Sequence, residues 1–268
     1  MENYEEYEII DAHAHIFPDK IAGIATESIG NFYDLKMRNI GNSTNLIESG
    51  KKINVSRYLV FSTATNPAQV HNINSFIANE CEQHKEFIGL GTLHPQSDDM
   101  ERDFNQVLEL NLKGIKLHPD FQKFDVDSKE AYKMYEIAEG RLPMLIHFGD
   151  RRYEYSAPKK LVQVHKDFPD LKVIAAHLGG YERWEEAQQY LAGMDNVWFD
   201  TSSSLDFMSK ETAVKYIRNL GIERCFFGTD FPMWRHTSEF YNLMSLGFTH
   251  DENQMILADN LRKFFGIL

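Results

Sequence analysis

Asp11, His13 and His15 place three side chains that can bind a metal ion at every second position near the start of the chain. Residues two apart in a β-strand point to the same face, so this spacing predicts that all three project in one direction. Two imidazoles at such a spacing can share one metal ion, although an isolated pair is more often two surface histidines. Asp11 could orient a ligand imidazole, reach the metal itself, or cap a loop.

Similar side chains recur much later in the chain. His147, His177 and Asp230 each directly follow a short strand-like segment, residues 142–146, 173–176 and 226–229. One such histidine is usually a packing residue, but a buried polar group without a partner costs about 1–3 kcal/mol, so the repetition favours a shared site. Three imidazoles and a carboxylate favour one Zn²⁺ per chain, and Mn²⁺ or Fe²⁺ are also compatible with this set.

The elements that must position these residues are eight strand-like apolar runs. They cover residues 7–17, 55–64, 86–95, 112–119, 142–150, 171–180, 196–204 and 224–233. Several runs are continuously apolar, which is typical of parallel strands covered by helices on one side and filled on the other. Eight of them predict an α/β fold, a (β/α)₈ TIM barrel, with its active site at the carboxyl ends of the strands.

Amphipathic stretches between the runs predict the covering helices, and residues 252–268 read as a final helix outside the barrel. A doubly wound sheet is the rival fold, but no glycine-rich phosphate loop follows the first run. Without repeats or a linker, residues 1–268 are expected to form a single barrel domain. Residues 30–49 are polar and long for a connection, so we expect an insertion over the site.

Charge and composition narrow the function classes. With 28 Lys and Arg against 40 Asp and Glu, the net charge of −12 argues against a nucleic-acid-binding protein. No apolar run approaches the ~20 residues of a membrane span, and the acidic start is unlike a signal peptide. The two cysteines suggest neither a disulfide framework nor a thiolate metal site. We therefore expect a cytoplasmic protein that acts on a small molecule without nucleic-acid or membrane partners.

Six motifs carry a resemblance to a known family: IIDAHAHIF, GIKLHPDFQ, MLIHFGD, VIAAHLGG, VWFDTSS and CFFGTDFPM. In this order, over nearly the whole chain, they resemble the amidohydrolase superfamily of metal-dependent barrels. Within it they are similar to the amidohydrolase-2 branch, which includes aminocarboxymuconate-semialdehyde decarboxylase, related aromatic-acid decarboxylases and lactone hydrolases. The resemblance implies that His13, His15, His147 and Asp230 bind the metal and that His177 is the catalytic histidine. It is also compatible with a homodimer.

Lys116 and His118 lie two apart in the fourth run, so both are expected to face the interior. In binuclear members of the superfamily a fourth-strand lysine is carboxylated, whereas the branch resembled here is typically mononuclear. A buried lysine must be paired or lose its proton, so Lys116 is expected to contact substrate or neighbouring carboxylates. His118 is equally compatible with the site and with loop packing.

Further substrate contacts are expected from the loops that follow the strands. Arg151 and Arg152 could pair with a substrate carboxylate, unless Asp150 and Glu154 neutralise them. Trp234 is close enough in sequence to Asp230 to form a pocket wall.

These residues predict a metal-dependent hydrolase that cleaves an ester, lactone or amide of a small, carboxylate-bearing substrate through a metal-activated water. In that reaction His177 moves a proton, and Asp230 holds the ion and accepts a proton. The same residues fit an alternative, the non-oxidative decarboxylation of a small carboxylic acid. A second alternative is a non-catalytic metal-binding or ligand-binding barrel.

Overall fold

A computed structural model describes residues 4–267 of the chain. Every predicted apolar run contains a parallel strand, and the third run contains two short ones separated by Leu90. The strands are β1 (Ile9–His15), β2 (Val55–Phe61), β3 (Phe87–Gly89), β4 (Gly91–Thr92), β5 (Ile115–Leu117), β6 (Met144–Ile146), β7 (Val173–Ala175), β8 (Val197–Asp200) and β9 (Cys225–Phe226).

The strands close into a barrel. One sheet has the order β1-β2-β3, and the other runs from β4 through to β9 with each strand beside the next. The segment after β9 returns to β1, where the amide of Ala12 donates to the carbonyl of Phe227 at 2.8 Å and that of His15 donates to Phe231 at 2.7 Å. The predicted (β/α)₈ barrel is therefore confirmed.

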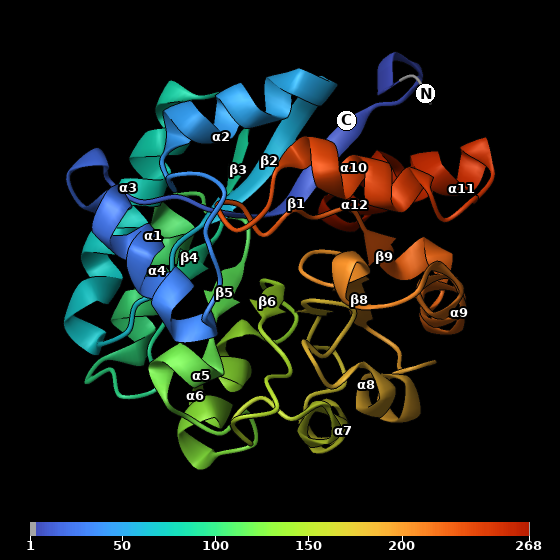
Figure 1. Cartoon of the computed structure of the whole chain (residues 1–268). Helices are drawn as coiled ribbons and strands as arrows, with labels where there is room; N and C mark the ends of the chain where they lie inside the picture. Colours follow the sequence, from blue (N-terminus) through green and yellow to red (C-terminus); the bar gives the residue numbers. More distant parts are fainter. Residues whose placement is uncertain (1–3, 268) are drawn as a thin grey trace.

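Helices surround this barrel (Figure 1). They are α1 (Asp19–Tyr33), α2 (Ser43–Gly50), α3 (Val70–Gln83), α4 (Met100–Glu109), α5 (Pro119–Gln122), α6 (Lys129–Ala138), α7 (Pro158–Asp167), α8 (Trp184–Tyr190), α9 (Lys210–Leu220), α10 (His236–Met244), α11 (His250–Gln254) and α12 (Asn260–Phe265). Side chains of Asp99, Ser128 and Ser209 cap α4, α6 and α9, which explains where these three helices begin.

Buried apolar side chains alternate between two clusters along the strands. Ile10 and Ala12 belong to the cluster inside the barrel, whereas Ile9 and Ala14 belong to the cluster between strands and helices. The pairing of β1 with β2 shifts register between Asp11 and Ala14. The strand therefore does not alternate regularly through its last residues, and this irregularity changes where its polar side chains point.

The C-terminal segment closes one end of the barrel. The helix predicted for residues 252–268 is observed from His250 to Phe265, with a π-helical turn, Met255–Asp259, joining α11 to α12. Residue 268 lies outside the described residues. The ring of Phe264 packs against Trp198 of β8 and Phe226 of β9. Within residues 4–267, no helix has both the length and the apolar composition of a membrane span.

Candidate metal centre

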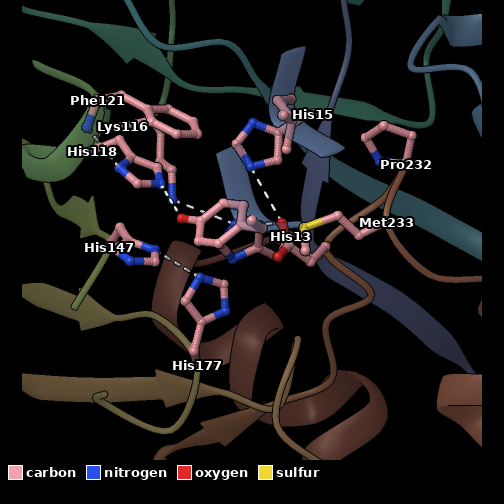
Figure 2. A pocket seen from close by; sticks show the side chains of 12 residues that line it. His13, His15, Lys116, His118, Phe121, His147, His177, Pro232 and Met233 are labelled. Atoms are coloured by element: carbon pink, nitrogen blue, oxygen red, sulfur yellow. Dashed lines mark hydrogen bonds and ion pairs between the residues drawn. The ribbon is translucent and has the colours of Figure 1, made fainter. Parts of the chain in front are cut away.

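Polar side chains from several strands meet around a small cavity at the carboxyl end of the barrel (Figure 2). The cavity has a volume of about 20 Å³, which is enough for a single water molecule or ion. The titratable side chains around it are those of His13, His15, Tyr33, Lys116, His118, His147, His177 and Asp230. Of the residues predicted for the site, the structure thus places seven on the wall of one cavity.

His13, His15 and Asp230 form the tightest group. Asp230 Oδ1 lies 3.3 Å from His15 Nε2 and 3.5 Å from His13 Nε2. One ligand atom from each residue lies within 4.8 Å of the others, so a single cation could contact all three. Ser203 Oγ donates to the other oxygen of Asp230 at 2.6 Å and fixes the carboxylate in this orientation.

Asp200, the last residue of β8, orients the imidazole of His13. His13 Nδ1 donates to Asp200 Oδ2 at 2.9 Å, which leaves the lone pair of Nε2 facing the cavity. The other oxygen of Asp200 accepts from the amides of His177 and Ser202 and from the Ser202 hydroxyl. A carboxylate that holds the far nitrogen of an imidazole is the usual support for a metal-binding histidine.

His147 and His177 face one another across the lower part of the cavity in Figure 2. His177 Nδ1 lies 3.1 Å from the carbonyl of Ser202, so this nitrogen carries the proton. His177 Nε2 must then accept from His147 Nδ1, at 3.0 Å. The chain of bonds leaves a lone pair on His147 Nε2, which is buried and has no hydrogen-bond partner.

His147 lies beside a second group of metal-binding side chains rather than within the group of His13, His15 and Asp230. Its Nε2 is 3.6 Å from Asp120 Oδ2, and His118 completes this second group. His118 Nδ1 accepts from the amide of Phe121, and its Nε2 is 2.9 Å from the hydroxyl of Tyr33. Because both nitrogens of His118 are engaged, it offers no lone pair to a second cation.

Lys116 is wholly buried beside this group. Its Nζ lies 3.4 Å from His13 Nε2 and 4.9 Å from the centre of the Phe61 ring. Burial lowers the pKa of Lys116 to about 8, although Asp200 and Asp230 oppose the shift. The ammonium group is therefore available inside the cavity, at neutral pH, to bind an anionic ligand.

The buried histidines are held neutral. Burial and the neighbouring Lys116 lower the pKa of His13 to about 4, and burial also lowers the pKa of His15. The pKa of His147 falls well below its usual value for the same reason, with His177 as a further cause. Neutral imidazoles are what a metal ion requires, because a protonated ring has no lone pair to give.

Asp11 points away from the cavity, and the expectation that it shares a face with His13 and His15 is wrong. The register shift in β1 turns it toward α10, where its Oδ2 lies 3.0 Å from His236 Nε2. Its carboxylate also accepts from the amides of His13 and Thr229. Asp11 therefore positions the backbone beside His13 and Asp230 and contacts the imidazole of His236, but it does not orient a metal-binding imidazole.

The two arginines predicted to bind substrate are engaged elsewhere. Arg151 has a 77% exposed side chain, which pairs with Glu182 at 3.2 Å. Arg152 contacts both oxygens of the buried Asp150, donates to the carbonyl of Phe32 and lies over its ring. Neither arginine lines the central cavity. The structure thus shows that Asp150 neutralises the charge of Arg152, which was one of the possibilities that the sequence left open.

Trp234 acts on the site through another residue. Its Nε1 donates to Ser203 Oγ at 2.8 Å, and Ser203 in turn holds Asp230. Trp234 itself is half-buried and is not part of the central cavity wall.

Sequence reasoning missed Asp200, Tyr33 and Asp120. A signal for Asp200 existed, because it follows an apolar strand just as Asp230 does. Tyr33 had no such signal: it reaches the cavity from the end of α1, a helix whose Gly23 and Gly30 weaken its helical pattern. Asp120 follows the predicted His118, but only the fold shows that it faces His147.

The donor set fits a single divalent cation. Two neutral imidazoles and a carboxylate converge, and the unpartnered Nε2 of His147 provides a further buried lone pair in the same cavity wall. Imidazole and carboxylate ligands suit Zn²⁺ and Mn²⁺ alike.

Comparisons with known proteins show the family and the fold of the chain. The sequence pattern of a family described as amidohydrolase matches residues 10–267. An uncharacterised protein of Sinorhizobium fredii is 21% identical, over 97% of this chain and 98% of its own length. Among solved structures, 5-carboxyvanillate decarboxylase from Sphingomonas paucimobilis has a TM-score of 0.74 at 15% identity, covering 97% of this chain and 99% of that one. A dihydroxybenzoic acid decarboxylase from Polaromonas, with bound manganese and an inhibitor, has a TM-score of 0.75 at 12% identity, covering 97% of both chains.

Proposed function

The chain belongs to the amidohydrolase family of enzymes, and we propose that it is a divalent-metal-dependent decarboxylase that removes carbon dioxide from a small carboxylic acid without oxidation. The observation that carries the proposal is the convergence of His13, His15 and Asp230 beside the buried ammonium group of Lys116. This arrangement offers a cation site and, next to it, a fixed positive charge for a carboxylate.

Two findings favour decarboxylation over the hydrolysis that the sequence analysis placed first. The similar solved structures include decarboxylases of carboxylated aromatic acids. The cavity that continues outward from the metal centre is also mainly apolar, which suits the apolar body of such an acid.

We assign the following roles to the chain's own residues. His13, His15 and Asp230 would hold the cation, and the unpartnered Nε2 of His147 in the same cavity wall is a further candidate ligand. A bound divalent cation supplies a Lewis acid that polarises the oxygens of the substrate. Asp200 keeps the proton of His13 on Nδ1, so that Nε2 stays free for the cation. Lys116 Nζ binds the substrate carboxylate or a neighbouring oxygen.

The reaction needs one proton and no oxidant. The bond between the carboxylate carbon and its neighbour breaks, its electron pair takes up a proton at the neighbouring carbon, and carbon dioxide leaves. His177 lines the cavity, and because its Nδ1 already carries a proton, Nε2 is the ring nitrogen at which it can take up a proton and release it again. Asp230, which also lines the cavity, can accept a proton during the cycle.

The test combines metal content with product analysis. Purified protein is incubated with 2,6-dihydroxybenzoate, 5-carboxyvanillate and a lactone panel while released carbon dioxide and opened lactone are measured. We expect one divalent ion per chain and carbon dioxide from at least one acid. His15→Ala should lose both the bound metal and the release of carbon dioxide. His71→Ala, which removes an exposed imidazole on α3, should keep both properties. Lactone opening without carbon dioxide release, or activity in metal-free protein, would overturn the proposal.

A further inference from the structure

A second and much larger cavity adjoins the metal centre. It has a volume of about 530 Å³ and lies between α1, the end of β2, α3 and α5. It shares the side chains of His15, Ile29 and Phe121 with the wall of the central cavity. A ligand with one end at the metal centre can therefore extend directly into this space.

The wall of the larger cavity is mainly apolar. Half-buried apolar side chains face it from α1, α3, α5 and the loop after β1, namely Phe17, Ile29, Phe32, Ile73, Phe76 and Phe121. Ile21 on α1 also lines the cavity and keeps 49% of its surface exposed. Lys123 contributes a cationic side chain to this wall, whereas Arg151 and Arg152 in the loop after β6 do not line it.

Two unsatisfied polar atoms belong to residues of this wall. Thr63 Oγ1 and Asp120 Oδ1 are both buried and have no hydrogen-bond partner within the described residues. Buried polar atoms without partners are costly, so such atoms beside a cavity indicate that a ligand or water satisfies them. An apolar wall with a few polar atoms is typical of a site for a small organic molecule.

The size of the cavity limits what fills it. An apolar cavity of about 150 Å³ suffices to bind benzene, and this one is more than three times as large. A substrate with a single unextended ring would leave most of the apolar wall in contact with water.

We propose that this cavity binds an apolar extension of the substrate, so that the acid is larger than one aromatic ring and carries an alkyl or second-ring group with an uncharged polar substituent. The inference rests on the proposed function for the position of the carboxylate at the metal centre. It assigns substrate selection to α1 and α3 rather than to the arginines after β6.

The experiment compares two probes on metal-loaded, full-length protein. Dissociation constants for 2-hydroxybenzoate and 4-hexyl-2-hydroxybenzoate are measured by calorimetry. Each buried methylene contributes about 0.8 kcal/mol, or about fourfold in affinity, so burial of half the hexyl chain gives about a sixtyfold preference for the longer probe. A preference below about threefold would refute the assigned cavity.

Matched tryptophan variants locate the effect. Ala25→Trp fills the cavity from α1, and Ser28→Trp does so one turn further along. Ile24→Trp adds the same ring to the neighbouring position, which is 74% exposed and not part of the cavity wall. We expect the ratio of the two dissociation constants to fall at least tenfold in a filling variant that retains the wild-type melting temperature, and to stay unchanged in Ile24→Trp. Equal ratios in all folded variants would refute the proposal.

A third probe separates this inference from the proposed function. 4-Hexylphenol has the extension but no carboxylate. If it binds wild-type protein and fails to bind the filled variant while no acid is decarboxylated, the cavity assignment stands and the decarboxylase proposal fails. If single-ring acids are decarboxylated and neither hexyl probe gains affinity, the decarboxylase stands and the cavity assignment fails.

Discussion

Replacing Asp200 with asparagine should weaken metal binding although Asp200 contributes no lone pair to the cation. One oxygen of Asp200 accepts from two amides and a hydroxyl, and the other accepts from His13 Nδ1. An asparagine must keep its single oxygen where the three donors are, which turns its NH₂ group toward His13. His13 Nδ1 then has to accept a hydrogen bond, its proton moves to Nε2, and the nitrogen meant for the metal is blocked.

The expected loss of metal affinity follows from the hydrogen bond between Asp200 and His13 that is lost. A hydrogen bond to a charged group contributes about 1.5–3 kcal/mol, which corresponds to about a 10- to 150-fold loss of metal affinity. Such a loss agrees with the 10- to 100-fold effects typical of changes to groups that orient metal-binding histidines. Competition with a chelating dye measures the metal dissociation constant. The matched control is Asp195→Asn, because the carboxylate of Asp195 lies before β8 and is 88% exposed. This variant should leave the metal dissociation constant unchanged. If folded Asp200→Asn protein binds metal within twofold of wild type, the proposed orientation of His13 is refuted.

Three further predictions concern other parts of the molecule. His177→Asn should lower kcat at least about 100-fold with little change in bound metal, because asparagine can still accept from His147 Nδ1 but cannot carry a proton. Loss of the metal together with activity would contradict the role of His177 in proton transfer. Arg152→Met should lower the free energy of unfolding by about 3 kcal/mol in urea titrations, because it leaves the buried Asp150 without its partner, whereas Arg151→Met should cost less than about 1 kcal/mol; equal effects would refute this distinction. Burial and nearby Asp206 raise the pKa of Glu239 well above its usual value, so the folded state favours the protonated acid and the protein loses stability as the pH rises and this carboxyl ionises. Glu239→Gln should therefore have the same melting temperature as wild type near pH 4 and a higher one at pH 8. A difference in melting temperature that does not grow with pH would contradict this role of Glu239.

Much of the fold could be read from local patterns. Each of the eight runs contains a strand because a parallel strand buried on both sides needs apolar residues throughout its length. Helices α3, α4 and α6 to α9 also followed from amphipathic spacing, whereas α1, α2, α5 and α10 did not. The sequences of α1 and α2 contain glycine and polar residues, and it is tertiary packing over the site that keeps them helical.

The positions of His13, His15, His147, His177 and Asp230 along the chain were enough to bring them to one end of a barrel, because all follow strands that run in the same direction. Sequence thus determined which side chains could meet. It could not determine which atoms face one another, since a register shift of one strand reverses the side on which a residue lies, as Asp11 demonstrates. The partnership of Asp200 with His13, the capture of Arg152 by Asp150 and the cavity between α1 and α3 join segments far apart in sequence, so they exist only once the barrel has closed.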